Sequence, residues 1–330
     1  MTFAMHAVPR SLDLSRASAP EVLGPTAEGL SSACFERRRM NGEAYVIKRL
    51  SYDTDWVMRA VDDVGPPRVV RMHASGLFDR LPTCIDTTLV DVAYDPETGL
   101  AELLMHDVTD AFLRDSNPIT AEQHAVLIDA MAQLHASTWG MTDEVGLTPA
   151  ASRWRAFSPA FARRESERGP LSGVPASLAP MWDRLAEVDP ATHRVLLDLV
   201  ENPTPLIAGL AGTPQALVHG DFKGGNLGLH PDGRVVLVDW AFPGIEAPCV
   251  DLAWYLAVNC DRIPESKELT IERYRTSLQS HGIDTSGWWD RQLPLGLLGG
   301  AVQMAWNKAE QPEELAWWAT RVGEASALLP

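Results

Sequence analysis

Residues 219–226 read HGDFKGGN, and these eight positions hold four side chains that can bind or move charge: His219, Asp221, Lys223 and Asn226. Short apolar runs flank the stretch on both sides, so we expect it to join two strands. A plain polar turn would need only the glycines and the aspartate. A loop that transfers phosphoryl groups would need further charged partners elsewhere in the chain, at particular distances.

Partners of the required kinds do occur elsewhere in the chain. Phosphoryl transfer from a nucleotide needs a cation at the α- and β-phosphates, magnesium, and a carboxylate at the acceptor hydroxyl. Asp239 follows Asn226 by 13 residues, and a turn and an apolar run lie between them, so a hairpin is expected to return Asp239 beside Asn226. Lys48, one of only four lysines in the chain, ends a strand-like run. These distances favour a phosphoryl-transfer loop over a plain turn.

The N-terminal part of the chain has the pattern of an antiparallel sheet. An Asn-Gly pair at residues 41–42 separates two strand-like runs, which is a strong hairpin signal because both residues tolerate positive φ. Residues 54–63 are expected to form a short helix that Thr54 caps and that the Gly-Pro-Pro at residues 65–67 ends. A second hairpin is expected around the turn at residues 95–99.

The pattern becomes mostly helical after about residue 108. A capping box at residues 120–123 is expected to open a helix that runs through Trp139. Residues 181–211 and 265–330 also have helical periodicity. Between them, the segment around HGDFKGGN reads as a small island of strands, so the densest polar motif lies on the only β structure of this part.

These motifs resemble the aminoglycoside phosphotransferase and choline kinase-like superfamily of small-molecule kinases. HGDFKGGN is similar to the H-G-D-x-x-x-x-N loop of that family, residues 237–240 to its I-D-W/F segment, and residues 244–253 to its stretch ending D-L-A. Gly220 stands where protein kinases carry arginine, which favours this family over protein kinases. The resemblance covers about residues 20–325.

The resemblance implies an α+β, bilobal, protein kinase-like fold. Residues 1–105 would form a β-rich, nucleotide-binding N-lobe with one helix. Residues 106–330 would form a mostly helical C-lobe with a small β island, and this lobe would hold the hinge, the catalytic loop and the acceptor-binding helices.

The resemblance also implies a role for each motif residue. Asp221 would accept or orient the proton of the acceptor hydroxyl, His219 would brace the loop, and Lys223 would lie either near the transferred phosphate or in solvent. Asn226 and Asp239 would hold Mg²⁺, which prefers oxygen ligands. The other residues would contact the nucleotide: Lys48 at the α- and β-phosphates, Ser31 and Ser32 in place of a glycine-rich loop, and Met105, His106 and Val108 at the hinge.

One expected residue is missing, because a helix glutamate should pair with the strand lysine. After Lys48 no glutamate occurs until Glu97, and the candidate helix offers only aspartates, namely Asp55, Asp62 and Asp63. This gap motivates an alternative function, a nucleotide-binding pseudokinase or regulatory protein with weak or no turnover. A protein kinase is disfavoured, because only 12 residues separate Asp239 from Asp251, the expected brace of the catalytic loop.

The favoured function is an ATP- or GTP-dependent phosphotransferase that uses Mg²⁺ and acts on a hydroxyl of a small molecule. Most of the net negative charge lies in residues 106–330, so an amino sugar, aminoglycoside or amino alcohol is a reasonable cationic acceptor. Macrolides, other sugars and homoserine-like metabolites stay open. The tryptophan pairs at residues 288–289 and 317–318 could pack helices or surround a cation, and packing is the more common use.

Composition argues against several other classes of function. The net charge of −16 disfavours general binding to nucleic acid. The longest nearly apolar stretch, residues 293–306, is shorter than the roughly 20 residues of a membrane span. The N-terminus lacks a signal-peptide pattern, and the four cysteines are scattered without a C-x-x-C pair. We therefore expect a cytoplasmic protein without a membrane segment, and the sequence does not predict its oligomeric state.

Overall fold

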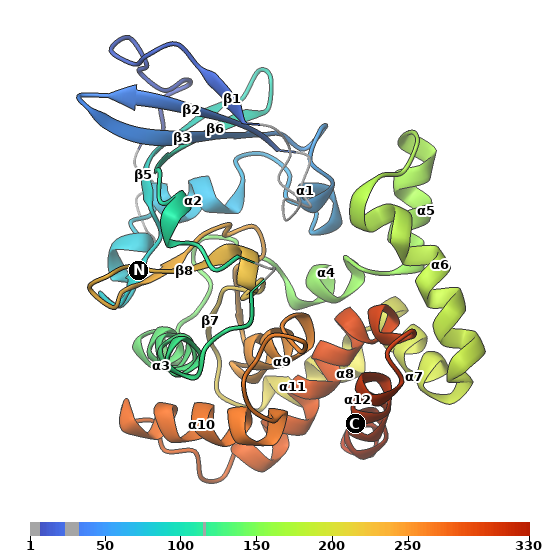
Figure 1. Ribbon diagram of the computed structural model, residues 1–330. Helices are drawn as coiled ribbons and strands as arrows, with labels where there is room; N and C mark the ends of the chain where they lie inside the picture. Colours follow the sequence, from blue (N-terminus) through green and yellow to red (C-terminus); the bar gives the residue numbers. More distant parts are fainter. Residues whose placement is uncertain (1–6, 24–32, 115–116) are drawn as a thin grey trace.

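The computed structural model describes residues 7–23, 33–114 and 117–330. They form a β-rich N-lobe and a helical C-lobe, with the first at the top of Figure 1 and the second below it. This is the α+β bilobal arrangement that the motifs imply. Ser31 and Ser32, the residues expected near the phosphates, lie outside the described ranges.

The N-lobe is built on an antiparallel sheet with the strand order β1-β2-β3-β6-β5. Its strands are β1 (Glu21–Leu23), β2 (Cys34–Met40), β3 (Glu43–Leu50), β5 (Leu89–Asp95) and β6 (Leu100–His106). Both expected hairpins are confirmed, since β2 pairs with β3 and β5 pairs with β6. Asn41 and Gly42 both adopt positive φ in the first turn. The sheet places Lys48 in the middle strand, β3.

The helix expected at residues 54–63 is the shorter α1 (Trp56–Ala60), and a second helix, α2 (Arg68–Ala74), follows it, so the N-lobe has two short helices where one was expected. Thr54 does not cap α1. The cap is Asp55, whose carboxylate accepts the backbone N–H of Val57 at 2.8 Å. Helix α1 already ends at Ala60, before the Gly-Pro-Pro at residues 65–67, and α2 begins directly after it at Arg68. The correction matters because it places a carboxylate at the start of α1.

The β island of the C-lobe forms two small sheets. Strand β7 (Ala216–Val218) pairs with β10 (Gly244–Glu246), and β8 (Leu227–Leu229) pairs with β9 (Val235–Leu237). A short strand from the N-terminal part of the chain, β4 (Ile85–Asp86), adds to β9 in parallel. Residues 219–226, which we call the catalytic-loop motif, therefore lie between β7 and β8. The sheet that contains β8 includes a strand from the N-terminal part of the chain as well as strands of the C-lobe.

The rest of the C-lobe is helical. Helix α3 (Ala121–Ser137) begins with the expected capping box of Thr120 and Gln123 and ends two residues before Trp139. The remaining helices are α4 (Ala150–Arg155), α5 (Pro159–Arg168), α6 (Gly173–Val188), α7 (Pro190–Glu201), α8 (Thr204–Ala211), α9 (Cys249–Val258), α10 (Lys267–Ser280), α11 (Trp289–Met304) and α12 (Pro312–Ser326). Among the described helices, none combines the length and apolarity that crossing a bilayer requires.

Helix α9 lies against α11 at very short range, because α11 presents glycines to it. A Cβ on Gly296 would lie 2.6 Å from the Cβ of Cys249, and a Cβ on Gly300 would lie 2.7 Å from that of Ala253. Real side chains do not approach so closely, so these glycines set the depth at which α9 is buried. The close packing on α11 consequently fixes the position of α9 relative to the catalytic-loop motif.

The two lobes also contact each other away from the hinge. Arg59 of α1 forms a two-point ion pair with Glu165 of α5, with N–O distances of 2.8 and 2.6 Å. The rings of Trp56 and Phe161 lie beside this pair with centroids 6.1 Å apart. Because α1 and α5 belong to different lobes, these contacts fix the position of α1 relative to the C-lobe (Figure 1).

Candidate active site

The carboxylate of Asp251 binds the backbone at the start of the catalytic-loop motif. This side chain comes from the first turn of α9 and accepts the backbone N–H groups of His219 and Gly220, each at 2.7 Å. His135 of α3 lies 3.3 Å from the same carboxylate. The expectation that Asp251 braces the loop agrees with these bonds.

His219 is fully buried and forms hydrogen bonds on both ring nitrogens. Its Nδ1 accepts the backbone N–H of Asp221 at 3.2 Å, so the proton must be on Nε2, which lies 3.1 Å from the carbonyl oxygen of Val238. Burial lowers the pKa of His219, because it penalises the charged imidazolium. A neutral His219 thus ties the catalytic loop to the strand that leads into Asp239.

The carboxylate of Asp221 is the centre of the loop and is nearly buried, at 6% exposure. Its Oδ2 accepts the side-chain amide of Asn226 at 2.8 Å and lies 3.2 Å from the ammonium of Lys223. Its Oδ1 accepts the indole N–H of Trp254 at 3.0 Å. Sequence reasoning missed Trp254, although its spacing of three residues from Asp251 places both on one face of α9.

Asp239 lies next to Asn226, as the hairpin between them requires. The backbone N–H of Val238 donates to the carbonyl of Asn226 at 3.1 Å. Asp239 itself adopts a positive φ of 64°, a region that non-glycine residues enter only where the surroundings enforce it. This turn directs the side chain upward toward the N-lobe.

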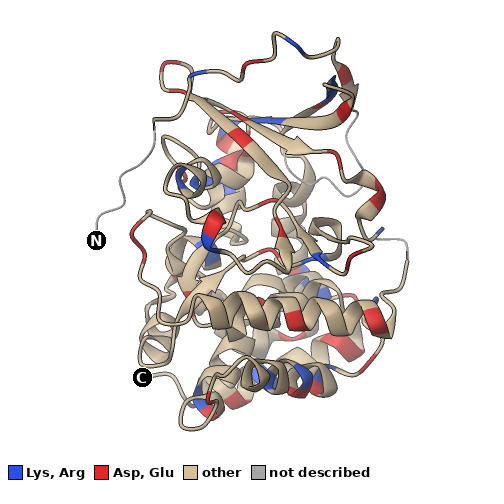
Figure 2. Cartoon of the chain, turned by 90° about the vertical axis from the view of Figure 1, so that its left-hand side faces the viewer, with Lys and Arg blue, Asp and Glu red and all other residues tan. Residues whose placement is uncertain are grey.

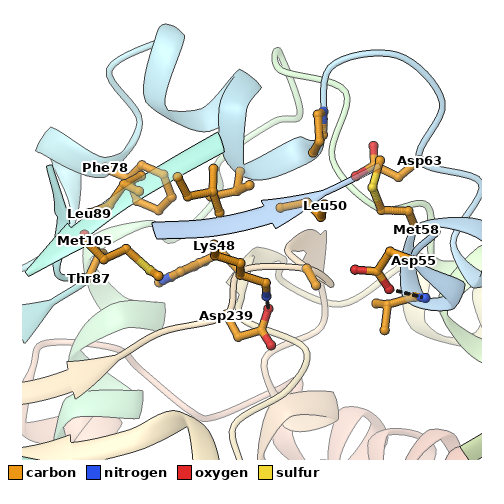
Figure 3. Close-up of a pocket in the computed structure, with 16 residues that line it drawn as sticks. Lys48, Leu50, Asp55, Met58, Asp63, Phe78, Thr87, Leu89, Met105 and Asp239 are labelled. Carbon is orange, nitrogen blue, oxygen red and sulfur yellow. Dashed lines mark hydrogen bonds and ion pairs between the residues drawn. The ribbon is translucent and has the colours of Figure 1, made fainter. Parts of the chain in front are cut away.

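Lys48 and Asp239 meet across the two lobes. The ammonium of Lys48 lies 2.7 Å from Oδ1 of Asp239, as Figure 3 shows by a dashed line. Burial would raise the pKa of Asp239, but the charge of Lys48 and its hydrogen bond hold that pKa below the usual value. The structure therefore brings together a lysine and an aspartate that are 191 residues apart in the chain.

The oxygen atoms of Asn226 and Asp239 fit a magnesium ion. The Nδ2 of Asn226 donates to both the carbonyl and Oδ2 of Asp221, so the orientation of the amide is fixed and its oxygen is turned away from that residue. The described part of the chain has no group of three His, Cys, Asp or Glu side chains that could hold a metal. Two protein oxygens with the rest supplied by phosphates and water is the usual arrangement for Mg²⁺ in kinases.

A pocket lies between the lobes beside the Lys48–Asp239 pair (Figure 3). One wall is apolar and includes Leu50, Leu89, Leu103 and Met105. Met105 therefore lines this pocket, and its contact with adenine stays a prediction. His106 is exposed, its ring centroid lies 5.2 Å from that of Tyr45, and its backbone N–H donates to the carbonyl of Thr88. Val108 follows in the segment that joins the lobes.

The three aspartates that the sequence offered as partners of Lys48, namely Asp55, Asp62 and Asp63, differ sharply in their surroundings. Asp62 is exposed, and Asp63 is bound by Arg71 at 2.7 Å and by the backbone N–H of Arg68 at 2.9 Å. Asp55 is buried and lines the same pocket as Lys48. Burial raises the pKa of Asp55, and the charge of Lys48 opposes that rise. Among the described contacts, Asp55 is therefore the one of the three aspartates that lines the pocket with Lys48 and whose carboxylate forms no hydrogen bond or ion pair with an arginine.

The space beside Gly220 is filled by the guanidinium of Arg153, from α4. Arg153 is buried and donates to Glu246 at 2.8 Å and to the carbonyl of Phe242. Gly220 has a φ of 77°, and a Cβ there would overlap both Arg153 Nη1 and the Phe242 carbonyl. The absence of a side chain at residue 220 is thus a steric requirement, since an arginine from another helix occupies that place.

We predict that Gly220→Ala destabilises the protein more than Gly233→Ala does. Both glycines have positive φ, but a Cβ on Gly233 would meet nothing within 4 Å. Left-handed strain should cost about 1 kcal/mol in Gly233→Ala, and added overlap should raise the loss to about 3 kcal/mol in Gly220→Ala. Chemical denaturation measures both values, and equal losses would contradict the packing described for Arg153.

Comparison with known proteins agrees with this geometry. A model of the family described as phosphotransferase enzyme family matches residues 46–279. The structure is similar to that of choline kinase LicA from Streptococcus pneumoniae, with a TM-score of 0.54 and 14% identity over 95% of each chain. It is also similar to that of an ethanolamine kinase from Plasmodium vivax, with a TM-score of 0.53 and 10% identity over 95% of this chain and 82% of that chain. Curated protein sequences include no significant match.

At these identities the solved structures show a shared bilobal fold. The family model also establishes the family of the chain, because the region that it matches covers well over half of the chain. That region includes Lys48, the catalytic-loop motif and Asp239. The chain therefore belongs to the phosphotransferase enzyme family and is a small-molecule kinase.

Proposed function

We propose that this kinase transfers the γ-phosphoryl group of ATP or GTP to a hydroxyl of a small amino alcohol or amino sugar. The observation that carries the proposal is the convergence of four groups from two lobes. The ammonium of Lys48 lies 2.7 Å from the carboxylate of Asp239. The backbone N–H of Val238, the residue before Asp239, donates to the carbonyl of Asn226. The side-chain amide of Asn226 in turn donates to the carboxylate of Asp221 at 2.8 Å. A cation, two metal-ligating oxygens and a carboxylate are the parts that phosphoryl transfer uses.

In this proposal Asp221 receives or orients the proton of the acceptor hydroxyl. Its carboxylate is nearly buried but is bonded only to neutral and cationic donors, so the charged form is compensated within the site. Lys223, whose side chain is 25% exposed, lies close enough to Asp221 to add positive charge near the transferred group. His219 acts on the loop rather than on substrate, because it is fully buried.

The nucleotide would occupy the pocket beside Lys48. The base would lie against the apolar wall near Met105 and meet the backbone at His106 and Val108, and the phosphates would lie at the Lys48–Asp239 end. Asn226 and Asp239 would hold Mg²⁺, which would neutralise charge on the phosphate oxygens. When phosphates and metal engage Asp239, Lys48 needs another acid, and we propose that Asp55 takes this place.

The choice of acceptor rests on two observations. Two of the solved structures that resemble this chain, with TM-scores of 0.54 and 0.53, are named as a choline kinase and an ethanolamine kinase, and choline and ethanolamine are amino alcohols. Charge alone does not select the acceptor, because Figure 2 shows Asp and Glu interspersed with Lys and Arg over both lobes. An amino sugar carries the same combination of a cationic nitrogen and a hydroxyl.

The tryptophan pairs do not form a cage for that cation. The ring of Trp317 already has Lys267 at 5.1 Å and Arg321 at 4.9 Å, so the chain supplies its own cations there. Trp288 packs on Trp139 at 5.3 Å. Helix packing is therefore the better interpretation of both pairs.

The proposal is tested by turnover of Mg·ATP and Mg·GTP with a panel of choline, ethanolamine, amino sugars, aminoglycosides and macrolides. We expect phosphorylation of at least one cationic acceptor, and we expect Asp221→Ala to reduce kcat by about 10²- to 10⁴-fold because it removes the proton acceptor. Asp232→Ala, in the exposed turn after β8, is the control and should retain activity.

Two results would contradict the proposal. Turnover that survives Asp221→Ala would remove Asp221 from the mechanism. Nucleotide binding without turnover on any acceptor would instead favour the pseudokinase alternative, which the absence of a helix glutamate motivates.

The role of Asp55 is tested by Asp55→Asn, which keeps a good helix cap but removes the charge. We expect kcat/KM for the nucleotide to fall about tenfold, the size of a lost bond to a charged group, with little loss of folding stability. Asp62→Asn is the matched control, since Asp62 is exposed and close in sequence. Equal kcat/KM values for the two variants would show that Lys48 does not need Asp55.

A further inference from the structure

Two side chains of helix α9, one turn apart, form hydrogen bonds with the residues around Asp221. Asp251 binds the backbone N–H groups of His219 and Gly220, and Trp254 binds the carboxylate of Asp221. The first contact fixes the path of the loop, and the second fixes the side chain that the loop carries. Trp254 is 5% exposed, so its bond to Asp221 is shielded from water.

The donors around Asp221 are divided unequally between its two oxygens. A carboxylate oxygen has two lone-pair directions. Among the described residues, Oδ2 has two donors, Asn226 and Lys223, whereas Oδ1 has one, Trp254. The carboxylate therefore keeps one accepting direction on Oδ1, and the position of the indole determines where that direction points.

We propose that Trp254 is a positioning residue for phosphoryl transfer, because its indole N–H orients Asp221 so that Oδ1 faces the acceptor hydroxyl. This inference rests on the proposed function, in which Asp221 receives that proton. As the acceptor oxygen bonds to the γ-phosphorus, the bond from phosphorus to the leaving oxygen of the nucleoside diphosphate breaks. The hydroxyl proton passes to Oδ1 of Asp221 and then to solvent.

Indole suits this place for a chemical reason. Its N–H is a donor only, so it orients the carboxylate without competing for the proton that Asp221 must accept. A histidine or tyrosine at residue 254 could itself exchange a proton. The carboxamide of Asn226 and the ammonium of Lys223 act on the other oxygen and leave the orientation of Oδ1 to Trp254.

The indole is also immobilised by its neighbours. The ring of Phe157 lies against that of Trp254 with centroids 5.5 Å apart, and Trp306 lies on Phe157 at 6.4 Å. These aromatic rings are all nearly buried. Because they restrict rotation of the indole, the N–H is held in one direction before any substrate arrives, which is the preorganisation that an active site needs.

A purely structural role for Trp254 predicts a different outcome from a positioning role, and two phenylalanine variants separate them. Trp254→Phe keeps an aromatic ring in the layer but removes the N–H that reaches Asp221. Trp306→Phe removes an N–H from the same layer, but that N–H donates to the backbone carbonyl of Gln303. Both variants lose similar packing, and only the first loses the bond to Asp221.

The first measurement is hydrolysis of Mg·ATP, with water as the probe acceptor, beside the equilibrium affinity for Mg·ADP. We expect Trp254→Phe to lower kcat at least tenfold with the Mg·ADP affinity unchanged, and Trp306→Phe to stay within twofold of the unaltered protein. If Trp254→Phe is folded and stays within twofold as well, the inference is overturned. If Asp221→Ala also leaves hydrolysis unchanged, the proposed function fails with it, so the two failures are distinguishable.

The second measurement does not depend on activity or on the folding of Trp254→Phe. In an NMR spectrum of the full chain, the indole ¹H–¹⁵N resonance of Trp254 is assigned by its connection to the backbone resonances of that residue. Its proton should be protected from exchange with solvent. Asp221→Ala should shift it toward the position of a solvent-exposed indole and abolish the protection, while Asp232→Ala should leave it unchanged. A resonance that does not respond to Asp221→Ala would contradict the hydrogen bond and overturn the inference.

Discussion

The carboxylate of Asp251 is fully buried and accepts the backbone N–H groups of two consecutive loop residues, His219 and Gly220. Burial alone would raise its pKa, but a hydrogen bond from His135 and nearby positive charge hold that pKa below its usual value. The ionised group can therefore fix the loop. A buried carboxylate that lost these donors would be costly, so loop and helix α9 support each other.

The geometry of the site depends on how deeply α9 is held. Glycines of α11 let the two helices approach until Cβ atoms would touch, and α9 then presents Asp251 and Trp254 to the loop. On the other side of the loop, the guanidinium of Arg153 fills the space beside Gly220 and donates to Glu246 and to the carbonyl of Phe242. As a result, groups outside the loop fix the loop backbone next to Asp221 and bind the carboxylate of Asp221, the proton acceptor in our proposal.

Contacts between the lobes connect this part of the C-lobe to the pocket beside Lys48. Strand β4 joins the C-lobe sheet, Arg59 binds Glu165, and Lys48 reaches Asp239. The Arg59–Glu165 pair holds α1, and with it the cap Asp55, in place relative to the C-lobe. Lys48 is then the mobile element in our proposal, because it has one acid on each side of the pocket to which it can pair.

The residues of the site were largely predictable where the chemistry lies in short motifs. The loop at residues 219–226 and the hairpin to Asp239 are local, so their spacing determines their geometry. Lys48 could be placed because the chain has few lysines and the strand before it is clear.

The residues that support the site were not predictable, because they reach it through tertiary packing. Trp254 depends on the rotation of α9, and Arg153 lies 67 residues before Gly220 in the chain. The parallel pairing of β4 with β9 joins segments about 150 residues apart. The expected helix at residues 54–63 was wrong in its cap, because Asp55 competes with Thr54 for that position and forms the bond to Val57.

We propose that Lys48 and Asp239, which meet across the lobes, bind one nucleotide–metal unit. The most direct test is the affinity for ATP, measured with and without Mg²⁺, in Lys48→Ala and Asp239→Ala. We expect Lys48→Ala to weaken ATP binding under both conditions, and Asp239→Ala to weaken it only when Mg²⁺ is present. Affinities equal to those of the unaltered protein in both variants would contradict it.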